Sequence, residues 1–404
     1  MKHHTIVGIV GISLATASLL YAAPKVNDGA APARSEAPHY ESDEAPSQDP
    51  KQGSPRGPGG NASELTVYVI DVEGGAATLF VSPTGESLLV DTGWPGLDGR
   101  DADRIAAAAR DAGVTRIDYL VVTHFHGDHM GGTRQLSERL PIVNFVDHGA
   151  TVQTEERQLT AFDDYAEVRG GGEHLVVKPG DVIPIAGLDV RVIASAGRVL
   201  QTPLAGGGQP NPYCENFVRH EGEVIRQEEG YRAEDVQSIS VSVRYGAFRT
   251  AAMGDLTWNK EYELMCPTNP LGELDVYLVS HHGSNTSGSE ALVHATTPRV
   301  AIMNNGPRKG GAVETFEILA AFPALEDLWQ NHYSVAGGAT HNRPEPFIAN
   351  LDEGAPLAGR ANTDPVHMGP SYWTKLSARE DGSFAVTNSR NGLTKEYDAP
   401  SRAR

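Results

Sequence analysis

The stretch "VVTHFHGDHMGG", residues Val121 to Gly132, places three histidines and an aspartate within six positions. It begins as an apolar, strand-like run and ends in glycines. One interpretation is a polar surface loop that happens to contain histidine. The other is a metal site, because imidazole nitrogens and carboxylate oxygens are the ligands that proteins offer to zinc, iron or manganese. The rest of the chain decides between the two.

Strand-like and helix-like segments alternate around this stretch. Runs such as Leu65 to Val72 and Ser87 to Gly93 are apolar and rich in β-branched residues, which predicts strands. Residues Asp101 to Ala112 predict a helix, since acids occupy the first turn and Gly113 follows the last. Asp381-Gly382 signals a hairpin near the C-terminus. Meandering strands followed by strands that alternate with helices predict an α/β fold, with two sheets covered by helices in layers.

Residues of ligand type also follow other apolar runs. The carboxyl ends of strands in an α/β sheet share one edge, and ligands gather there. A single histidine or aspartate at a strand end is more often a surface residue. Three separate clusters are harder to explain in that way: Thr123 to His129, Gly254-Asp255 and His281-His282. The same kind of position is occupied by Asp91, His148 and Asn304.

The length and composition suit one globular domain with tails. The chain has 404 residues, and 39% of them are hydrophobic. Its formal net charge of −19 disfavours general attraction to nucleic-acid phosphates, although bound cations could reverse the sign locally. Residues 24–63 are rich in Pro, Gly, Ser, Asp and Glu, which predicts a disordered low-complexity tether. The folded domain is expected over residues 64–400.

The N-terminus has the pattern of an export signal. A short basic stretch precedes an apolar run from Ile6 to Leu20 that ends in small residues. This run is short for a membrane span, so it predicts a signal peptide over residues 1–23 and a periplasmic or extracellular protein. A retained N-terminal anchor is the alternative. In an exported chain, Cys214 and Cys266 are expected to form a disulfide.

The motif His124-x-His126-x-Asp128-His129, followed by Gly131-Gly132, resembles the signature of the metallo-β-lactamase superfamily. Three more motifs occur in the family's order: "LLVDTG" from Leu88, "AAMGDLTW" from Ala251 and "VSHHGSN" from Val279. Together they look most like the extracellular domain of DNA-uptake competence proteins, here free-standing and without their many membrane spans. The resemblance spans about Leu65 to Asn305. It implies a four-layer αββα sandwich and a metal-dependent hydrolase.

The resemblance also implies two divalent metal ions, most readily zinc, with manganese or iron as alternatives. The expected ligands are His124 and His126 for the first metal, Asp128 and His129 for the second, and Asp255 between both. The last ligand should come from the "HHGS" turn, where His282 is preferred and His281 is the alternative. Asp91 in the "DTG" turn is expected to orient the site through hydrogen bonds. Whether one or two metals bind is left open.

One position departs from the family. Many members supply a third histidine to the first metal, from the end of a strand where this chain has "VIASAG" and offers only Ser195. His148 could substitute, since its strand should end at the same edge. His174 and His220 are weaker alternatives. The first metal is therefore expected to be loosely held, exchangeable or completed by water.

The implied reaction is hydrolysis by a hydroxide held between the metals, which lower the pKa of water. Asp128 could accept a proton, and His281, if it binds no metal, could act as general acid. Side chains that could contact the substrate are Ser284, Asn285, Asn304 and Asn305. A phosphodiester or related phosphoester is expected as substrate, and Arg308 and Lys309 are the nearest basic pair. The alternatives are a carbonyl substrate, either a lactone or a β-lactam, and a catalytically degenerate binding domain.

Overall fold

The computed structural model describes residues 63–219, 230–352 and 367–400, although not the side chains of 230–232. The predicted signal peptide, residues 1–23, lies outside these ranges, as does all of the predicted tether except residue 63. Within the described residues, no helix combines the length and the apolar character that crossing a bilayer requires.

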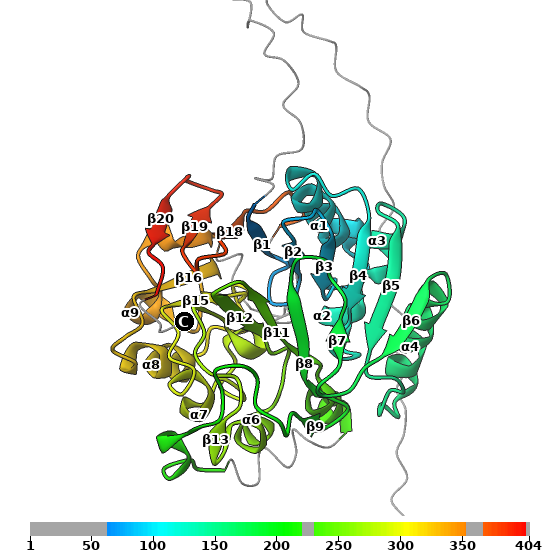
Figure 1. The fold of residues 1–404 in the computed structure, drawn as a ribbon. Coiled ribbons are helices and arrows are strands. Elements are labelled where there is room, and N and C mark those ends of the chain that lie inside the picture. The colour runs from blue at the N-terminus through cyan, green and yellow to red at the C-terminus, as the bar shows by residue number, and fades with distance from the viewer. Residues whose placement is uncertain (1–62, 220–229, 353–366, 401–404) are drawn as a thin grey trace, which may run out of the picture. The chain divides into compact units, whose positions relative to one another are not determined.

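Two mixed sheets form the centre of the described structure (Figure 1). The first sheet has nine strands in the order β20-β19-β18-β1-β2-β3-β4-β5-β6. Their bounds are Leu65–Ile70 (β1), Thr78–Val81 (β2), Ser87–Val90 (β3), Ile117–Val121 (β4), Ile142–Asp147 (β5), Glu173–Val176 (β6), Trp373–Ala378 (β18), Phe384–Asn388 (β19) and Thr394–Tyr397 (β20). The predicted hairpin is present, because β18 and β19 pair antiparallel on either side of Gly382.

The second sheet follows the order β17-β16-β15-β14-β12-β11-β8-β7, with β9 paired to β8. Its strands are Val182–Ile183 (β7), Asp189–Ser195 (β8), Arg198–Val199 (β9), Ser240–Tyr245 (β11), Phe248–Ala252 (β12), Val276–Leu278 (β14), Val300–Met303 (β15), Asp327–His332 (β16) and Ile348–Asn350 (β17). A separate two-stranded ladder joins β10 (Gln209–Pro210) to β13 (Thr268–Asn269).

Helices cover the outer faces of both sheets. The α-helices are α1 (Arg100–Asp111), α2 (Gly127–Met130), α3 (Thr133–Ser137), α4 (Glu156–Arg169), α6 (Trp258–Met265), α7 (Glu290–Val293), α8 (Val313–Ala321) and α9 (Gly338–His341). The 3-10 helices are η1 (Leu97–Gly99), η2 (Pro212–Cys214), η3 (Gly230–Gln237), η4 (Ser280–Gly283) and η5 (Glu345–Phe347). Figure 1 shows α1 and α3 beside the first sheet and α6 to α8 beside the second.

Three hydrophobic clusters hold these layers together. Alternation along β1 sends Val67 and Val69 into a cluster shared with Val243 and Trp329 of the second sheet, so the two sheets pack face to face. The opposite face of the first sheet packs on α1 through a second cluster. A third cluster joins the outer face of the second sheet to helices such as α8, through Phe316. The predicted four-layer αββα sandwich is confirmed.

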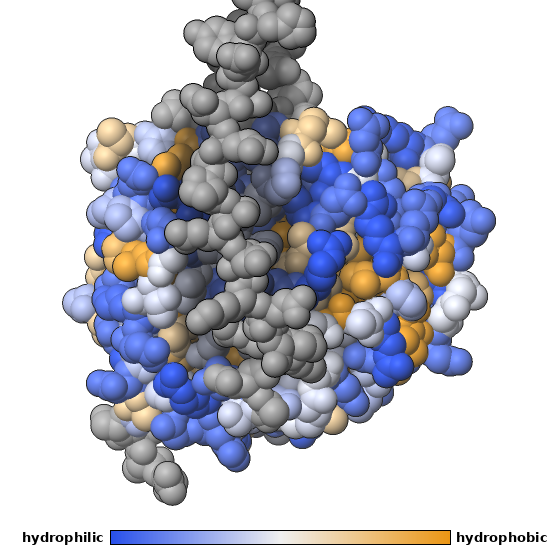
Figure 2. All heavy atoms as spheres, turned by 90° about the horizontal axis from the view of Figure 1, so that it is seen from above, coloured by the Kyte–Doolittle hydropathy of each residue, from blue (hydrophilic) through white to orange (hydrophobic). Residues whose placement is uncertain are grey.

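The visible surface is largely hydrophilic, as the acidic composition leads one to expect. In Figure 2, which views the molecule from above, blue residues dominate and a group of hydrophobic residues shows on one side. The sequence contains 52 acidic and 33 basic residues, and this excess of negative charge favours solubility over attraction to anionic polymers.

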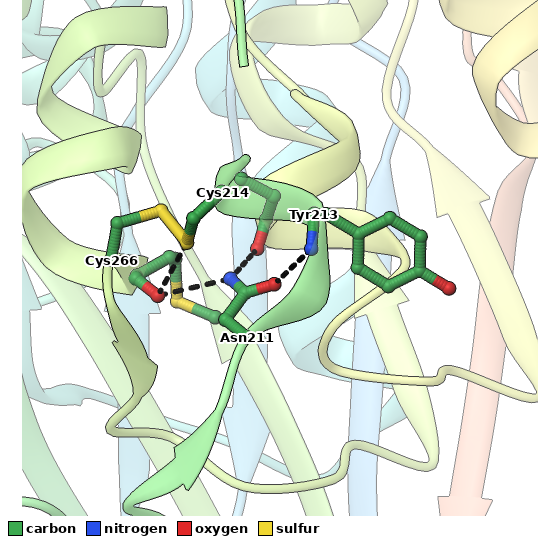
Figure 3. The surroundings of a disulfide bond; sticks show 6 residues. Asn211, Tyr213, Cys214 and Cys266 are labelled. Atoms are coloured by element: carbon green, nitrogen blue, oxygen red, sulfur yellow. Dashed lines mark hydrogen bonds between the residues drawn. A yellow bond between two sulfur atoms is a disulfide. The ribbon is translucent and has the colours of Figure 1, made fainter. Parts of the chain in front are cut away.

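The predicted disulfide is present and joins Cys214 to Cys266 (Figure 3). Beside it, the Asn211 side chain donates to the carbonyl oxygens of Met265 and Ala291, at 2.9 and 2.8 Å, and accepts from Tyr213 N. These bonds fasten η2 to the end of α6. The long insertion between β9 and β11 is therefore tied to the helical layer of the second sheet.

Reducing this disulfide is expected to destabilise the domain by about 4 kcal/mol, because the bridge closes a long loop. The two cysteines are separated by 52 positions. Urea unfolding of the Cys214→Ser/Cys266→Ser protein and of the oxidised wild type would measure the difference. Midpoints that coincided would show that Asn211 and its neighbours hold the insertion without the covalent bond.

Candidate metal centre

The ligand-type residues converge on one edge of the sandwich. His124 to His129 follow β4 and enter α2, and Asp255 follows β12. His281 and His282 follow β14 in η4. Strands β3, β4 and β5 run parallel in one sheet, and β12, β14 and β15 run parallel in the other. The carboxyl ends of both parallel sets therefore meet where these residues lie.

A first set, the four-residue group, consists of Asp128, His129, Asp255 and His282. His129 Nε2 lies 3.3 Å from Asp128 Oδ2, 3.3 Å from Asp255 Oδ2 and 3.3 Å from His282 Nε2. His282 Nε2 lies 3.4 and 3.5 Å from the same two carboxylate oxygens. A tetrahedral metal with ligands at about 2.0–2.1 Å separates those ligands by about 3.3–3.4 Å. The four-residue group has the spacing of a tetrahedral site.

A second set, the three-residue group, consists of His124, His126 and Asp235. Asp235 Oδ1 lies 3.0 Å from His126 Nδ1 and 3.4 Å from His124 Nε2. The two histidine nitrogens are 2.9 Å apart. Although these ring nitrogens lie close, Asp235 Oδ1 is a buried oxygen that forms no well-aligned hydrogen bond among the described residues. Such an oxygen is costly to bury unless a cation or proton satisfies it, which fits a ligand atom.

Asp255 and His281 connect the two groups. Asp235, Asp255 and His281 form a third set of mutually close ligand atoms. His281 Nε2 lies 3.1 Å from Asp255 Oδ2, the same oxygen that faces His129 and His282. Both histidines of the "HHGS" turn therefore point into the centre, where the sequence had left a choice between them.

Neighbouring hydrogen bonds fix the orientation of the rings. Asp91 Oδ2 lies 2.8 Å from His129 Nδ1, which leaves Nε2 directed into the four-residue group. Asp91 is itself held by the backbone and hydroxyl of Thr123, at 2.8 and 2.9 Å. His281 Nδ1 lies 3.0 Å from Thr286 Oγ1 and 3.1 Å from Ser287 Oγ. Partners of this kind set the tautomer and hold the ring in place.

The turn that carries both histidines is strained. His281 and His282 have φ values of 50° and 55°, in the left-handed region that β-carbon sterics disfavour. The backbone holds them there, since His281 N donates to Gly254 O at 3.0 Å and Gly311 N donates to His282 O at 2.9 Å. An added Cβ at Gly310 would lie 2.0 Å from His282 O. The following loop can therefore approach the turn only with glycine at that position.

Burial and mutual charge shape the electrostatics of the centre. Burial opposes charge on Asp255, yet His129, His281 and His282 hold its pKa well below the usual range. Burial also opposes charge on His129, but Asp255, Asp128 and Asp91 raise its pKa well above the usual value. These carboxylates stabilise positive charge in the centre, and a bound cation would be stabilised in the same way.

His124 shows the opposite behaviour, because burial lowers its pKa to about 4. The neighbouring rings of His129 and His126 act in the same direction. A neutral imidazole at neutral pH has a free lone pair, which metal binding requires. The three-residue group thus offers two imidazole nitrogens, of which that of His124 is held neutral, and one carboxylate.

His148, expected as a substitute ligand, is not part of the three sets of close ligand atoms. Its Nε2 lies 3.0 Å from Glu234 Oε2. Glu234 also accepts from Thr151 Oγ1 and, at 2.7 Å, from Val152 N. These contacts hold η3, and so His148 supports the segment that carries Asp235.

The weaker alternatives lie elsewhere. His174 Nε2 lies 2.8 Å from Asp147 Oδ1. Ser195 Oγ donates to Val177 O. His220 lies outside the described residues. The sequence analysis missed Asp235 because it lies at the end of an insertion whose composition does not indicate a metal ligand. The available signal was the pair of acidic residues Glu234-Asp235 shortly before β11.

The four expected substrate contacts differ in their surroundings. Asn305 is fully buried, and its amide donates to Gly306 O and His332 O, so it holds the loop after β15. Ser284 Oγ lies 3.0 Å from Thr286 Oγ1, while Asn285 is exposed. The Asn304 Oδ1 atom is buried without a hydrogen-bond partner in the described part of the chain. Asn285 is the most accessible of the four, Ser284 and Asn304 are half-buried, and Asn305 is buried.

Glu261 of α6 stabilises the segment after the turn. Its carboxylate accepts from Gly288 N at 2.7 Å and from Ser289 N at 2.8 Å. Burial raises the pKa of Glu261 to about 7, although these backbone bonds favour the charged form. Tyr277, also fully buried, is the neighbouring titratable group.

The stability contributed by Glu261 is expected to fall as pH rises. Its pKa is raised on folding, so between pH 4.5 and about 7 the folded protein keeps a proton that the unfolded chain releases. Stability should drop by about 3 kcal/mol across this window and stay constant above it. Urea unfolding of chelator-treated wild type and Glu261→Gln at several pH values would isolate this contribution. Parallel pH curves for the two proteins would contradict it.

A family model of the metallo-beta-lactamase superfamily matches residues 70–303. Recombination protein 2 of Haemophilus influenzae is 26% identical to the chain over 242 residues, which are 59% of this chain and 24% of that protein. The chain thus spans about a quarter of the length of that curated relative.

Solved structures with similarity to the chain include Tm1679, a metal-dependent hydrolase of the beta-lactamase superfamily, with a TM-score of 0.38 at 14% identity over 66% of this chain and 95% of that one. A diphosphatase of the PhnP family has a TM-score of 0.35 at 13% identity, over 71% and 94% of the two chains. The family match itself covers more than half of the chain. The resemblance inferred from the motifs is confirmed, and this protein belongs to the metallo-β-lactamase superfamily.

Proposed function

We propose that this protein is a metal-dependent hydrolase that acts on phosphodiesters or related phosphoesters at the centre formed by the four-residue and three-residue groups. The observation that carries the proposal is the tetrahedral spacing of the four-residue group, with nitrogen–oxygen distances of 3.3–3.5 Å. Closed structural zinc sites favour cysteines, whereas this centre is built from histidines and carboxylates. That ligand set supports a catalytic role.

Each residue has a proposed task in holding two divalent cations, zinc or alternatively manganese or iron. His129 and His282 would bind one cation together with Asp128, and His124 and His126 would bind the other with Asp235. Asp255 would face both. Asp91 would keep His129 oriented. When bound, such cations lower the pKa of a coordinated water and stabilise the oxyanion that develops during hydrolysis.

His281 and Asp128 remain the proposed proton carriers. The His281 side chain is 11% exposed, more than the other histidines and acids of the three sets. Its Nδ1 is anchored by Thr286 and Ser287, so its Nε2 is directed at the centre. It can either bind a cation together with Asp235 and Asp255 or hold a proton for the leaving group. Asp128 would accept a proton in turn.

A phosphoester is the substrate class that the charges favour. Lys309 is an ammonium group at the centre, and with divalent cations it would complement an anionic substrate. The net charge of −19 favours a small phosphoester over a long nucleic acid.

Metal analysis combined with a substrate panel tests the proposal. Purified protein should contain divalent metal and hydrolyse bis(p-nitrophenyl) phosphate, and a chelator should abolish turnover until zinc or manganese is restored. His126→Ala should remove the activity, whereas His174→Ala, a histidine outside the centre, should retain it. Turnover of a lactone or a β-lactam alone would overturn the phosphoester assignment. Metal without turnover on any substrate would favour a degenerate binding domain.

Export is a further part of the proposal. The disulfide between Cys214 and Cys266 supports it, since such bonds persist in oxidising compartments. Cell fractionation, with the mass of the mature N-terminus, would test both export and cleavage near residue 23. An uncleaved chain in the membrane fraction would favour the retained anchor.

A further inference from the structure

Lys309 lies beside the metal centre on a rigid support. Its ammonium forms an ion pair with Asp128 Oδ2, the oxygen that belongs to the four-residue group. The ammonium also lies 5.0 Å from the centroid of the Trp94 ring. The side chain is therefore held between a carboxylate at the centre and an aromatic face.

The loop that carries Lys309 is locked to its surroundings. Gly306 N donates to Lys309 O at 2.9 Å, which closes a tight turn. Ala312 N donates to Gly283 O at 2.8 Å and binds the same loop to the "HHGS" turn. An added Cβ at Gly74 would lie 2.7 Å from Lys309 Cβ, so a third segment packs against the start of the side chain. The direction of Lys309 is thus fixed by the fold.

Lys309 is also on the accessible side of the centre. Its side chain is 27% exposed, whereas those of Asp128 and His282 are 6% and 1% exposed. A substrate that reaches the four-residue group from solvent therefore meets Lys309. One ion pair leaves the ammonium with further N–H donors, because lysine has three.

We propose that Lys309 is a specificity-determining residue that binds an anionic oxygen of the substrate, a non-bridging phosphoryl oxygen, next to the four-residue group. The inference rests on the proposed function for the position of the substrate. Trp94 keeps the ammonium in place, and Asp128 directs it toward the centre. Neutral substrates gain nothing from this contact, so Lys309 separates anionic from neutral esters.

The chain provides a closely matched control in Lys375. That lysine is 28% exposed, pairs with Asp111 at 3.5 Å and lies 4.9 Å from the centroid of the Tyr68 ring. It repeats the same carboxylate and aromatic contacts outside the candidate centre. Lys309→Met and Lys375→Met remove one charge each while keeping similar volume.

Calorimetric titration of metal-loaded protein with inorganic phosphate is the first test. Wild type and Lys375→Met should bind phosphate equally, and Lys309→Met should bind it about 10- to 100-fold more weakly, as expected for one charge-assisted hydrogen bond. Lys309→Arg should recover part of the affinity. Metal content, measured on the same samples, should be unchanged. Loss of metal in Lys309→Met would make Lys309 a structural counterion of Asp128 and overturn the proposal, as would unchanged phosphate affinity.

Turnover provides the second test and separates this inference from the proposed function. For bis(p-nitrophenyl) phosphate, Lys309→Met should lower kcat/KM by about 10- to 100-fold, while hydrolysis of any neutral ester should be unchanged. Equal losses on both substrates would overturn the specificity role. A wild type that binds phosphate through Lys309 but cleaves no phosphoester would refute the proposed function while leaving the anion contact intact.

Discussion

Replacing Asp255 with alanine is expected to remove most of the bound metal and to lower kcat/KM by about 10³-fold or more. The Asp255 Oδ2 atom lies 3.3 Å from His129 Nε2, 3.5 Å from His282 Nε2 and 3.1 Å from His281 Nε2. It therefore belongs both to the four-residue group and to the set that includes Asp235. Losing a ligand of both sets should cost several kcal/mol of transition-state stabilisation, at about 1.4 kcal/mol per tenfold in rate.

The measurement pairs metal content with kinetics, and Asp147→Asn is the matched control. Asp147 is also a fully buried aspartate at the end of a strand, with His174 and Arg169 as partners. Its replacement should reduce stability while leaving metal and turnover per folded molecule unchanged. Wild-type metal content and turnover in Asp255→Ala would mean that the reaction occurs elsewhere on the chain.

The fold was predictable where local pattern and burial agree. The helix expected over residues 101–112 is α1, Arg100–Asp111, because its alanine-rich face packs on the first sheet and its acids occupy the first turn. Alternation along β1 fixed which residues face the second sheet. The pairing of β18 with β1 joins segments from the two ends of the domain, and no local sequence pattern predicts such a distant partner.

A residue of the candidate centre was predictable from the sequence when it belongs to a short motif of neighbouring residues. The residues from His124 to His129 lie in the loop that follows β4 and in the short helix α2, so a single motif locates them. Asp235 lies beside His124 and His126 but comes from an insertion, and the spacing of residues in that insertion matches no ligand motif. His148 was expected at this edge because it follows β5, and it does lie buried near its end. A strand-end position predicts the edge, but tertiary packing decides the partner, and here the partner is Glu234.

Replacing Asp235 with alanine is expected to lower kcat/KM by about 10²-fold or more and to reduce metal content by up to half. Asp235 Oδ1 lies within 3.4 Å of both histidine nitrogens of the three-residue group, and without it only His124 and His126 remain. An imidazole that binds a metal is neutral, so these two rings would carry no charge to offset a divalent cation. The four-residue group keeps all of its members, so this variant should retain part of its metal.

His148→Ala is the discriminating companion, since the sequence favoured His148 and the geometry favours Asp235. His148 acts through Glu234, so its loss should cost about 10-fold, in the range of partners that support a ligand without binding metal. Asp235→His, which restores a nitrogen ligand of the kind that many relatives use, should recover metal more than Asp235→Ala does. If His148→Ala lost more metal than Asp235→Ala, the ligand assignment would reverse, and η3 would serve only to shape the wall of the centre.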